Sequence, residues 1–550
     1  MAGAAFFIVF IEIGWLYGFY NIGVVLFAGI HRRSKKINEA SPASRPYFAN
    51  QTPAVAILYT TYNDFVEASA ESCVHQDYSN FTVYLLDDST DPAYRRRVDA
   101  FAAKYPERVR VVRRPNRRGF KAGNLNHALA KAVHQEPFFA IADADEILPP
   151  DFLQKMTLHL LADPACGFVQ ANHRCNPNAS SPLAKALGIG IDIHWKWYQP
   201  LRNKFGFVMF LGHGAVLRRK CWEVVGGFPE IVSEDLAYAI RIRERGWRGK
   251  FVEDVVCYED FPESIRAFRV RHMKWTRGTC EFLFREAGRL IRSPRISWVE
   301  KLDILFPTLN LPLTLFYFLF MINANLVLPA ILGVPHPLTM VWRNQEFTLP
   351  TYTLHSGFSV IYSADFFAIT LLTFLAPVLC FILELANRPL RLFRFLSHST
   401  AVYAALTPLF AVGVISYLFT GKATFLVTGD RSQAASSNVP EPKPPLGKKW
   451  RAELQTFLSR SHPDQKSVQA FEIFVGLVFA FTCLLLIQVS FLGLTIAFML
   501  LPIMHRLSWE HRMIQRFVYL PFILIIGGLF LGSCAAFGMQ PTFFGYGFHF

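Results

Sequence analysis

Apolar and polar positions alternate in long blocks along this chain of 550 residues. About 20 apolar residues at the rise of an α-helix are enough to cross the hydrocarbon core of a bilayer. Segments of roughly that length with few charges occur near residues 4–30, 308–332, 362–386, 468–488, 490–506 and 516–538. The pattern therefore predicts six transmembrane helices, one before and five after a long polar stretch.

The polar stretch covers residues 31–300 and has an internal pattern of its own. Short apolar runs alternate there with segments of helix length, and these runs are residues 55–59, 82–86, 109–112 and 138–142. Continuous apolar runs of this length are typical of strands that are buried on both faces of a parallel sheet. The stretch is therefore predicted to be an α/β domain with a mostly parallel sheet, whose ligands bind at the carboxyl ends of the strands.

One further segment, residues 399–420, is free of charge and long enough to cross a membrane. Both flanks are basic, with arginines within 388–394 before it and Lys422 after it. Clustered Lys and Arg mark the cytoplasmic side of membrane segments. Because both ends then lie on the same side and Pro408 interrupts the middle, we expect a bent re-entrant or interfacial helix pair.

These patterns divide the chain into five parts, with both termini outside the cell and the α/β domain in the cytosol. The parts are an N-terminal transmembrane helix (1–30), the α/β domain (31–300), an interfacial helix with two transmembrane helices (301–398), a re-entrant or interfacial segment with a polar linker (399–466) and three C-terminal transmembrane helices (467–550). The expected location is the cell (inner or plasma) membrane, with several passes through the bilayer.

Composition agrees with this class of protein. Hydrophobic residues make up 52% of the chain, and the net charge is +15. The basic residues gather beside the apolar segments and form no nucleic-acid-binding motif, so nucleic acid is excluded as the partner. The nine cysteines contain no CxxC pair, which favours reduced cytosolic thiols over disulfides or a zinc site.

Asp143-Ala144-Asp145 is the leading candidate for chemistry, because it ends the apolar run 138–142. Side chains two positions apart share one face of a strand, so both carboxylates can serve one metal ion. Oxygen ligands favour Mg²⁺ or Mn²⁺, and such an ion suits a diphosphate group. The alternative is an acidic turn before Pro149-Pro150.

Other polar residues fall at neighbouring strand ends. Thr61 and Asp64 follow the first run, and Asp87 and Asp88 end the second. Lys121 stands just before a helix-like pattern, where a lysine and free backbone N–H groups suit a diphosphate. Taken singly, each of these residues also fits a solvated loop.

Two motifs further along suit an acceptor. Glu234 and Asp235 precede the amphipathic pattern of residues 236–241, where acids simply favour a helix N-terminus but where Asp235 also suits a general base. Arg271, Lys274 and Trp275 offer cations and an aromatic platform on which a sugar ring can stack. By itself, this second motif fits an ordinary amphipathic surface helix.

The order of these motifs resembles that of the family 2 glycosyltransferases of the processive cellulose-synthase-like group. In that family a cytosolic GT-A domain lies between membrane helices and carries an early aspartate, a DxD, a TED and a QxxRW motif. The corresponding residues here are Asp88 or Asp87, Asp143-Ala144-Asp145, Ser233-Glu234-Asp235 and Arg271 to Trp275. Residues 425–428 resemble the FxVT gating loop of the same enzymes.

The resemblance implies a role for each residue. The donor UDP-sugar is expected to contact Thr61, Asp64, Asp87, Asp88, Lys121, Asp143, Asp145 and Thr428, with Asp145 and Asp143 holding the metal. Asp235 becomes the catalytic base, and Glu234, Arg271, Lys274 and Trp275 bind the acceptor. The sequence departs from the family pattern at Arg271, which replaces Gln, and at Lys274, which replaces Arg, so linkage and processivity stay open.

The expected function is that of an inverting, processive transferase. It would move a hexose, with glucose as the first choice, from a UDP-sugar to a growing β-glycan and export the polymer through its membrane helices, with accessory export subunits as further partners. The main alternative is a non-processive enzyme that glucosylates a membrane lipid, as ceramide glucosyltransferases do, and Arg271 fits that variant. A transporter or scaffold with a decayed transferase domain is disfavoured, because all the acidic positions are present.

Overall fold

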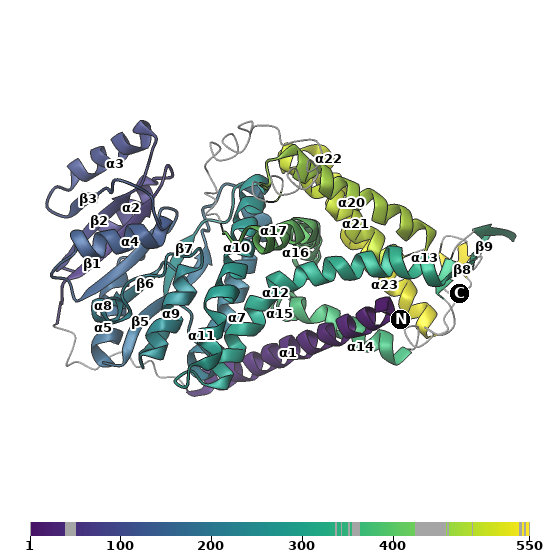
Figure 1. Cartoon of the computed structure of the whole chain (residues 1–550), viewed down its shortest axis with the longest axis horizontal. Helices are drawn as coiled ribbons and strands as arrows, with labels where there is room; N and C mark the ends of the chain where they lie inside the picture. Colours follow the sequence, from purple (N-terminus) through teal and green to yellow (C-terminus); the bar gives the residue numbers. More distant parts are fainter. Residues whose placement is uncertain are drawn as a thin grey trace.

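The computed structural model describes residues 2–38, 51–335, 338–342, 344–349, 352–354, 364–423, 458, 461–486, 488–537, 542–543 and 546–548. A domain built on a seven-stranded sheet forms one end of the molecule, and a bundle of long helices forms the other (Figure 1). The N-terminal end of the first helix and the C-terminus lie at the end of the bundle that is remote from the sheet (Figure 1). The chain therefore separates a polar domain from an apolar one, as the sequence blocks predict.

The sheet contains all four of the predicted strands. Its strands are β1 (Val55–Thr61), β2 (Phe81–Asp87), β3 (Val109–Val112), β4 (Phe138–Asp143), β5 (Cys166–Cys175), β6 (Ala215–Arg218) and β7 (Arg248–Glu259). They lie in the order β3-β2-β1-β4-β6-β5-β7, and only β6 runs antiparallel to its two neighbours. The prediction of a mostly parallel α/β sheet of the GT-A type is confirmed.

Alternating side chains of the strands pack against two separate layers of helices. Along β1, Ala56 and Leu58 face a core shared with α4 and α9. Ile57 and Tyr59, which point the other way, face a core shared with α2, α3 and α5. Because both faces are covered, the strand is apolar throughout, which explains its unbroken hydrophobic run.

Ten helices belong to this part of the chain. They are α2 (Glu67–Val74), α3 (Pro92–Lys104), α4 (Phe120–Lys131), α5 (Phe152–Ala162), α6 (Pro182–Leu187), α7 (Ile189–Phe205), α8 (Arg219–Val225), α9 (Glu234–Glu244), α10 (Ile265–Arg285) and α11 (Ala287–Arg292). The register of the sheet pairs Thr60 with Asp143 and Thr61 with Asp87. The polar ends of β1, β2 and β4 therefore lie side by side at one edge of the domain.

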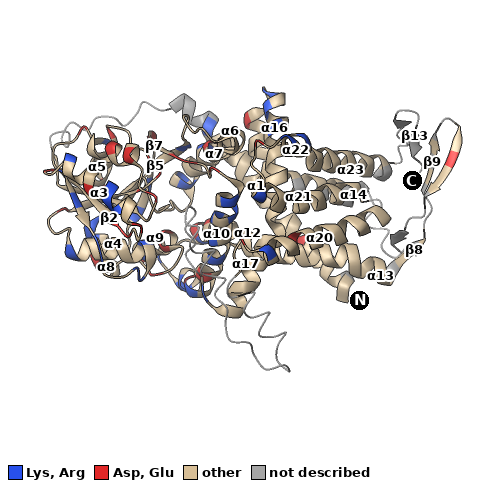
Figure 2. Ribbon diagram, turned by 90° about the horizontal axis from the view of Figure 1, so that it is seen from above, with Lys and Arg blue, Asp and Glu red and all other residues tan. Residues whose placement is uncertain are grey.

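The helical bundle contains the remaining helices. They are α1 (Ala2–Asn38), α12 (Trp298–Ile322), the π-helical turn η2 (Asn323–Val327), α13 (Leu328–Leu332), α14 (Ala364–Leu375), η4 (Ala376–Val378), α15 (Leu379–Leu385), α16 (Pro389–Val402), η5 (Ala404–Leu406), α17 (Thr407–Thr420), α20 (Lys466–Leu485), α21 (Val489–Arg506), α22 (Arg512–Phe517) and α23 (Leu520–Ala536). Short strands cap its far end, namely β8 (Gly333–Pro335), β9 (Leu338–Trp342), β10 (Gln345–Leu349), β11 (Tyr352–Leu354), β12 (Thr542–Phe543) and β13 (Tyr546–Phe548). Charged residues concentrate on the sheet domain and at its junction with the bundle (Figure 2).

Within the described residues, six helical segments are long and apolar enough to cross a membrane. They are 5–32, 298–331, 389–420, 466–485, 489–506 and 512–534. The predicted span 362–386 is not among them, and within it the structure has the shorter apolar helix Leu371–Leu385, which includes the η4 turn. These helices mark a membrane protein.

Residues 389–420 differ from the other apolar segments. Their apolar window is 72% buried inside the protein, whereas that of the N-terminal helix is only 11% buried. In Figure 1, α16 and α17 are seen nearly end-on, and in Figure 2 they run across the long axis that α1 and α12 follow. With the bend at η5, this arrangement favours the interfacial placement.

Buried polar contacts fix α10 of the sheet domain to the bundle. Arg269 forms an ion pair with Glu472 of α20, and both side chains are fully buried. On the same helix, Arg277 donates to the carbonyl oxygen of Ser461 at 2.7 Å. Gly413 of α17 crosses α10 so closely that an added Cβ would lie 2.9 Å from Met273 Sδ. The helix that carries Arg271 to Trp275 is therefore held rigidly against the membrane helices.

We expect Glu472→Ala to destabilise the protein strongly. Removal of one partner of a fully buried ion pair leaves the other charge without compensation, at a cost of about 3–5 kcal/mol. Thermal unfolding of the detergent-solubilised protein should show a large drop in the midpoint. The matched control is Arg289→Gln, which breaks a partly exposed pair with Glu244 and should cost about 1 kcal/mol or less. Equal shifts for the two variants would contradict this account of the junction.

Candidate active site

Asp143 ends β4 at the carboxyl edge of the central strands, and this edge with the adjoining starts of α4 and α9 is here called the cleft. Its Oδ1 atom accepts hydrogen bonds from Lys121 Nζ at 2.5 Å and from Thr60 Oγ1 at 2.9 Å. Burial alone would raise the pKa of this carboxyl, but the Lys121 ammonium outweighs that effect and holds the pKa well below its usual range. Asp143 is therefore a permanent anion with a fixed orientation.

Asp145 lies two positions further on and is exposed to the cleft. Its carboxylate makes no hydrogen bond or ion pair with any side chain in the described part of the chain. The surrounding protein walls and the Asp143 carboxylate raise the pKa of Asp145. An unpaired carboxylate oxygen in a polar cleft is a hard ligand, so Asp145, with the second oxygen of Asp143, fits a Mg²⁺ or Mn²⁺ ion.

The acids at the ends of β1 and β2 are already paired with neighbours. Asp87 is fully buried, and its Oδ2 atom accepts from Arg113 Nε at 2.7 Å. Asp88 forms a two-pronged contact with Arg114, at 2.8 Å from Nε and 2.6 Å from Nη2. The Thr61 hydroxyl donates to Asp64 Oδ1 at 2.8 Å. These contacts order the loops that follow β1 and β2 and neutralise much of the negative charge there.

Lys121 belongs to the first turn of α4, whereas the sequence pattern placed it before the helix. The helix begins at Phe120, after Gly119 with φ +70°. Phe120 itself has φ +47°. The start of the helix therefore depends on a left-handed backbone conformation, which the pattern of apolar residues does not indicate. Burial lowers the pKa of Lys121, but the Asp143 and Glu234 carboxylates raise it above its ordinary value. The lysine is therefore a fixed cation at a helix N-terminus.

Glu234 and Asp235 form the first turn of α9, on the opposite wall of the cleft. Asp235 Oδ1 accepts from the backbone N–H of Leu236 at 2.7 Å, which leaves Oδ2 facing Gly212. Burial raises the pKa of Asp235, and burial together with Asp235 raises the pKa of Glu234 to about 8. A carboxylate whose pKa is raised is a better proton acceptor than an ordinary aspartate.

The lip of the cleft is formed by one face of α10. Arg271 and Trp275 lie one helical turn apart, with the guanidinium 5.4 Å from the centre of the indole ring. Trp275 is 44% exposed, which is unusual for so large an apolar side chain and leaves part of the ring accessible to a ligand. Burial lowers the pKa of Lys274, and the nearby Glu234 carboxylate opposes that effect. The structure thus brings three of the four predicted acceptor residues to one face of α10, whereas the fourth, Glu234, lies on α9.

Thr428 and the rest of the FxVT-like segment lie outside the described residues, so their predicted contact with the nucleotide stays a prediction.

Sequence reasoning missed a buried ionic network directly behind the cleft. His213 Nδ1 lies 3.2 Å from Glu146 Oε1, and its Nε2 atom lies 3.5 Å from Glu259 Oε2. His173 contacts the same two acids at 3.6 and 3.4 Å. Burial lowers the pKa of His213, but Glu146 and Asp143 raise it to about 10, so the ring is cationic. The signal for this network in the sequence is Glu146, which directly follows Asp145.

Gly212 lies next to both Asp235 and Lys121. Its φ is +86°, and a Cβ atom there would lie 3.4 Å from Asp235 Oδ2 and 3.6 Å from Lys121 Nζ. We expect Gly212→Ala to lower transfer activity at least about tenfold, because the backbone is strained at positive φ and the methyl group enters the cleft. Gly226→Ala is the control, since it has a similar φ of +83° but open space around it. If both variants kept full activity, Gly212 would not line the reacting centre.

Comparison with known proteins agrees with this geometry. Residues 53–278 match the family model described as Glycosyltransferase like family 2. Residues 53–278 form a family 2 glycosyltransferase domain that resembles the cellulose-synthase-like type. The chain is 28% identical over 301 residues to probable glucomannan 4-beta-mannosyltransferase 1 of Arabidopsis thaliana, covering 52% of this chain and 54% of the relative. It is 25% identical to glucomannan 4-beta-mannosyltransferase 1 of Cyamopsis tetragonoloba, covering 56% and 62%.

Among solved structures, the glycosyltransferase domain is similar to the mannosyltransferase PcManGT from Pyrobaculum calidifontis in complex with GDP-Man and Mn²⁺. That likeness has 22% sequence identity and a TM-score of 0.41, and it covers 58% of this chain and 86% of the other. The chain spans little more than half the length of the plant relatives that it matches.

Proposed function

We propose that this glycosyltransferase transfers a hexose, with inversion, from a nucleoside-diphosphate sugar to a growing β-glycan at the membrane surface. One observation carries the proposal. Asp235 Oδ2 and Lys121 Nζ meet at Gly212, and Lys121 also holds Asp143 at 2.5 Å. A base for the acceptor and a cation for the leaving diphosphate therefore stand at one point of the cleft.

Donor binding follows from the charges around the cleft floor. Asp145 and Asp143 would hold a divalent cation, which when bound neutralises the diphosphate oxygens of the donor. Lys121 and the N-terminus of α4 attract the same group from the other side. Asp88 and Asp64, with Thr61, line the wall nearest to the nucleoside, whereas the fully buried Asp87 supports that wall through Arg113.

The transfer step needs one proton acceptor. Asp235 takes the proton from the attacking acceptor hydroxyl as the new bond forms at the anomeric carbon. The bond from that carbon to the diphosphate oxygen breaks with its electron pair, and the diphosphate leaves against Lys121. Attack opposite to the leaving group inverts the anomeric centre. Trp275 supports the acceptor ring at the lip, where Arg271 and Lys274 position its hydroxyl groups.

The identity of the sugar is a choice between two hexoses. The sequence favoured glucose from UDP-glucose, but the relatives above are named mannosyltransferases and lend no support to glucose in particular. We therefore propose mannose as the first candidate and retain glucose as the second. Both hexoses leave the roles of Asp235 and Trp275 unchanged.

Growth of a polymer is favoured by the placement of α10. The Trp275 lip lies on a helix that is anchored to the membrane bundle through Arg269 and crossed by α17, so the acceptor site stands next to the bundle. The catalytic domain is proposed to lie in the cytosol, where nucleotide sugars are made, with an export path through the helices. Accessory export subunits stay a prediction. The alternative acceptor, a membrane lipid, is favoured by Arg271 alone.

Release of nucleoside diphosphate tests the activity. Purified protein in detergent should release diphosphate from GDP-mannose or UDP-glucose in the presence of Mg²⁺ or Mn²⁺ and a short β-glycan primer. The same protein with Asp235→Asn is the blank. Absence of release above this blank from either donor would contradict the proposed transfer.

A further inference from the structure

A second cavity, separate from the catalytic cleft, lies where the sheet domain meets the helical bundle. Its volume is about 410 Å³, and β5, α7 and the connection from α15 to α16 contribute its walls. On β5, Arg174 faces this cavity, whereas the adjacent His173 belongs to the ionic network behind the catalytic cleft. None of the residues that are assigned to the transfer reaction lines this cavity.

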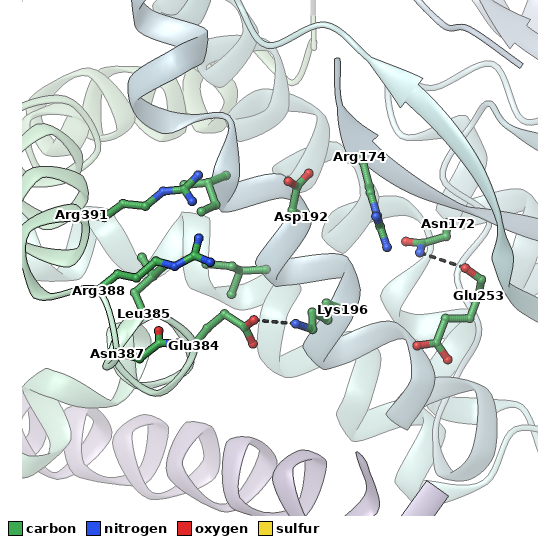
Figure 3. A pocket seen from close by; sticks show the side chains of 12 residues that line it. Asn172, Arg174, Asp192, Lys196, Glu253, Glu384, Leu385, Asn387, Arg388 and Arg391 are labelled. Atoms are coloured by element: carbon green, nitrogen blue, oxygen red, sulfur yellow. Dashed lines mark hydrogen bonds and ion pairs between the residues drawn. The ribbon is translucent and has the colours of Figure 1, made fainter. Parts of the chain in front are cut away.

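Three guanidinium groups converge on this space. Figure 3 shows Arg388 and Arg391 reaching into the cavity from the α16 side, while Arg174 points into it from the opposite wall. None of the three side chains has a hydrogen bond or ion pair with another side chain in the part of the chain that the structure describes. The nearby Asp192 carboxylate attracts Arg174 and Arg391 without forming an ion pair with either, so it offsets only part of their charge and leaves the rest for a ligand.

Three acids also line the cavity, namely Asp192, Glu253 and Glu384, beside four basic side chains, namely Arg174, Lys196, Arg388 and Arg391. Glu384 accepts from Lys196 Nζ at 2.5 Å, from Trp197 Nε1 at 3.0 Å and from Arg32 Nη1 at 3.3 Å. Asp192 accepts from the backbone N–H of Cys175 at 2.9 Å. Glu384 is therefore balanced by its own donors, and with four basic and three acidic side chains the lining of the cavity keeps one net positive charge.

One wall of the cavity is apolar and continues toward the membrane helices. Leu385, the last residue of α15, and Ile193 of α7 line the cavity beside the arginines. Just outside, α16 exposes Leu390 (84%) and Phe393 (43%). A free inorganic anion gains no affinity from an apolar wall, whereas the glycerol and upper acyl chains of a lipid can pack against it.

We propose that this cavity binds the phosphate headgroup of an anionic phospholipid. Arginine guanidinium groups match phosphate oxygens in geometry and charge. The cavity also lies against the first turn of the 14-residue helix α16, whose free N–H groups add favourable dipoles. The bound lipid joins α16 to the sheet domain through Arg174, and its acyl chains extend along Leu385 toward the bilayer.

Native mass spectrometry of the full-length protein in detergent tests the proposal, with dioleoylphosphatidylglycerol and dioleoylphosphatidylcholine as the titrated lipids. The wild-type protein should retain phosphatidylglycerol in preference to phosphatidylcholine. Arg388→Gln and Arg391→Gln should each weaken the binding of phosphatidylglycerol about fivefold. Arg174→Gln, on the opposite wall, should weaken the binding of phosphatidylglycerol by a similar factor. That result would exclude an effect that is confined to α16.

Arg394→Gln is the matched control, because Arg394 lies one turn further along α16 but does not line the cavity. Its affinity for phosphatidylglycerol should equal that of the wild type. Equal losses for Arg394→Gln and Arg391→Gln would overturn the proposal in favour of general attraction to a negative surface. Equal retention of the two lipids by the wild type, or displacement of phosphatidylglycerol by millimolar inorganic phosphate, would overturn it as well. Unchanged thermal unfolding of each variant verifies that the fold is intact.

Discussion

Asp235→Asn is expected to reduce glycosyl transfer by about 10²–10⁴-fold and to leave donor binding nearly unchanged. The amide keeps the shape of the side chain and can still accept from the Leu236 N–H, but it cannot take a proton from the acceptor. Transfer should be measured as glycan formed, and donor affinity as calorimetric binding of the nucleoside diphosphate. Glu244→Gln, at the other end of α9, is a control that should retain full activity.

The dependence of activity on pH is a second test of the role of Asp235. Burial raises the pKa of Asp235, so the base is lost by protonation at a higher pH than an ordinary aspartate would be. Activity should therefore fall as the pH decreases through that raised pKa, while nucleotide binding persists. If Asp235→Asn kept wild-type turnover, the assignment of the base would be wrong.

Asp145→Asn is expected to abolish the dependence of donor binding on Mg²⁺ or Mn²⁺. Asp145 is the carboxylate that is exposed to the cleft without a partner among the described side chains, so its charge is what a cation would contact. Transfer should fall at least about a hundredfold, because several kcal/mol of charge stabilisation are lost with the metal. Chelation of the metal in the wild-type protein should reproduce the same loss.

Asp151→Asn is the matched control for this second variant. Asp151 lies beyond the end of β4 and pairs with Lys155 at the surface, so its removal should leave metal dependence intact. A wild-type enzyme that is unaffected by chelators, together with a fully active Asp145→Asn, would contradict the metal site.

The sheet and the order of the site residues were predictable from the sequence for a physical reason. A strand that is covered on both faces must be apolar throughout, so β1, β2 and β4 were recognisable as unbroken runs. Parallel strands end at one edge, which brings Asp143 beside the end of β1. The placement of Trp275 on the lip could also be expected, because the motif order resembles a known family.

Other features depend on contacts between residues that are distant in sequence. The pairing of Asp88 with Arg114 and the network of His213 with Glu259 join segments whose spacing carries no signal. The start of α4 at Phe120 depends on a positive-φ turn that the apolar pattern does not record. The cavity between Arg174 and Arg391 exists only because the sheet domain packs against the bundle.

The most direct test of the central claim is the size and linkage of the product made by the purified enzyme. GDP-mannose and UDP-glucose, each with Mn²⁺ and a β-glycan primer, should be supplied in separate reactions, and the products should be sized and digested with linkage-specific endoglycanases. The account predicts β-linked hexose polymers that extend the primer and are absent with Asp235→Asn. A product that carries a single hexose on a membrane lipid, with no extension of the primer, would contradict it.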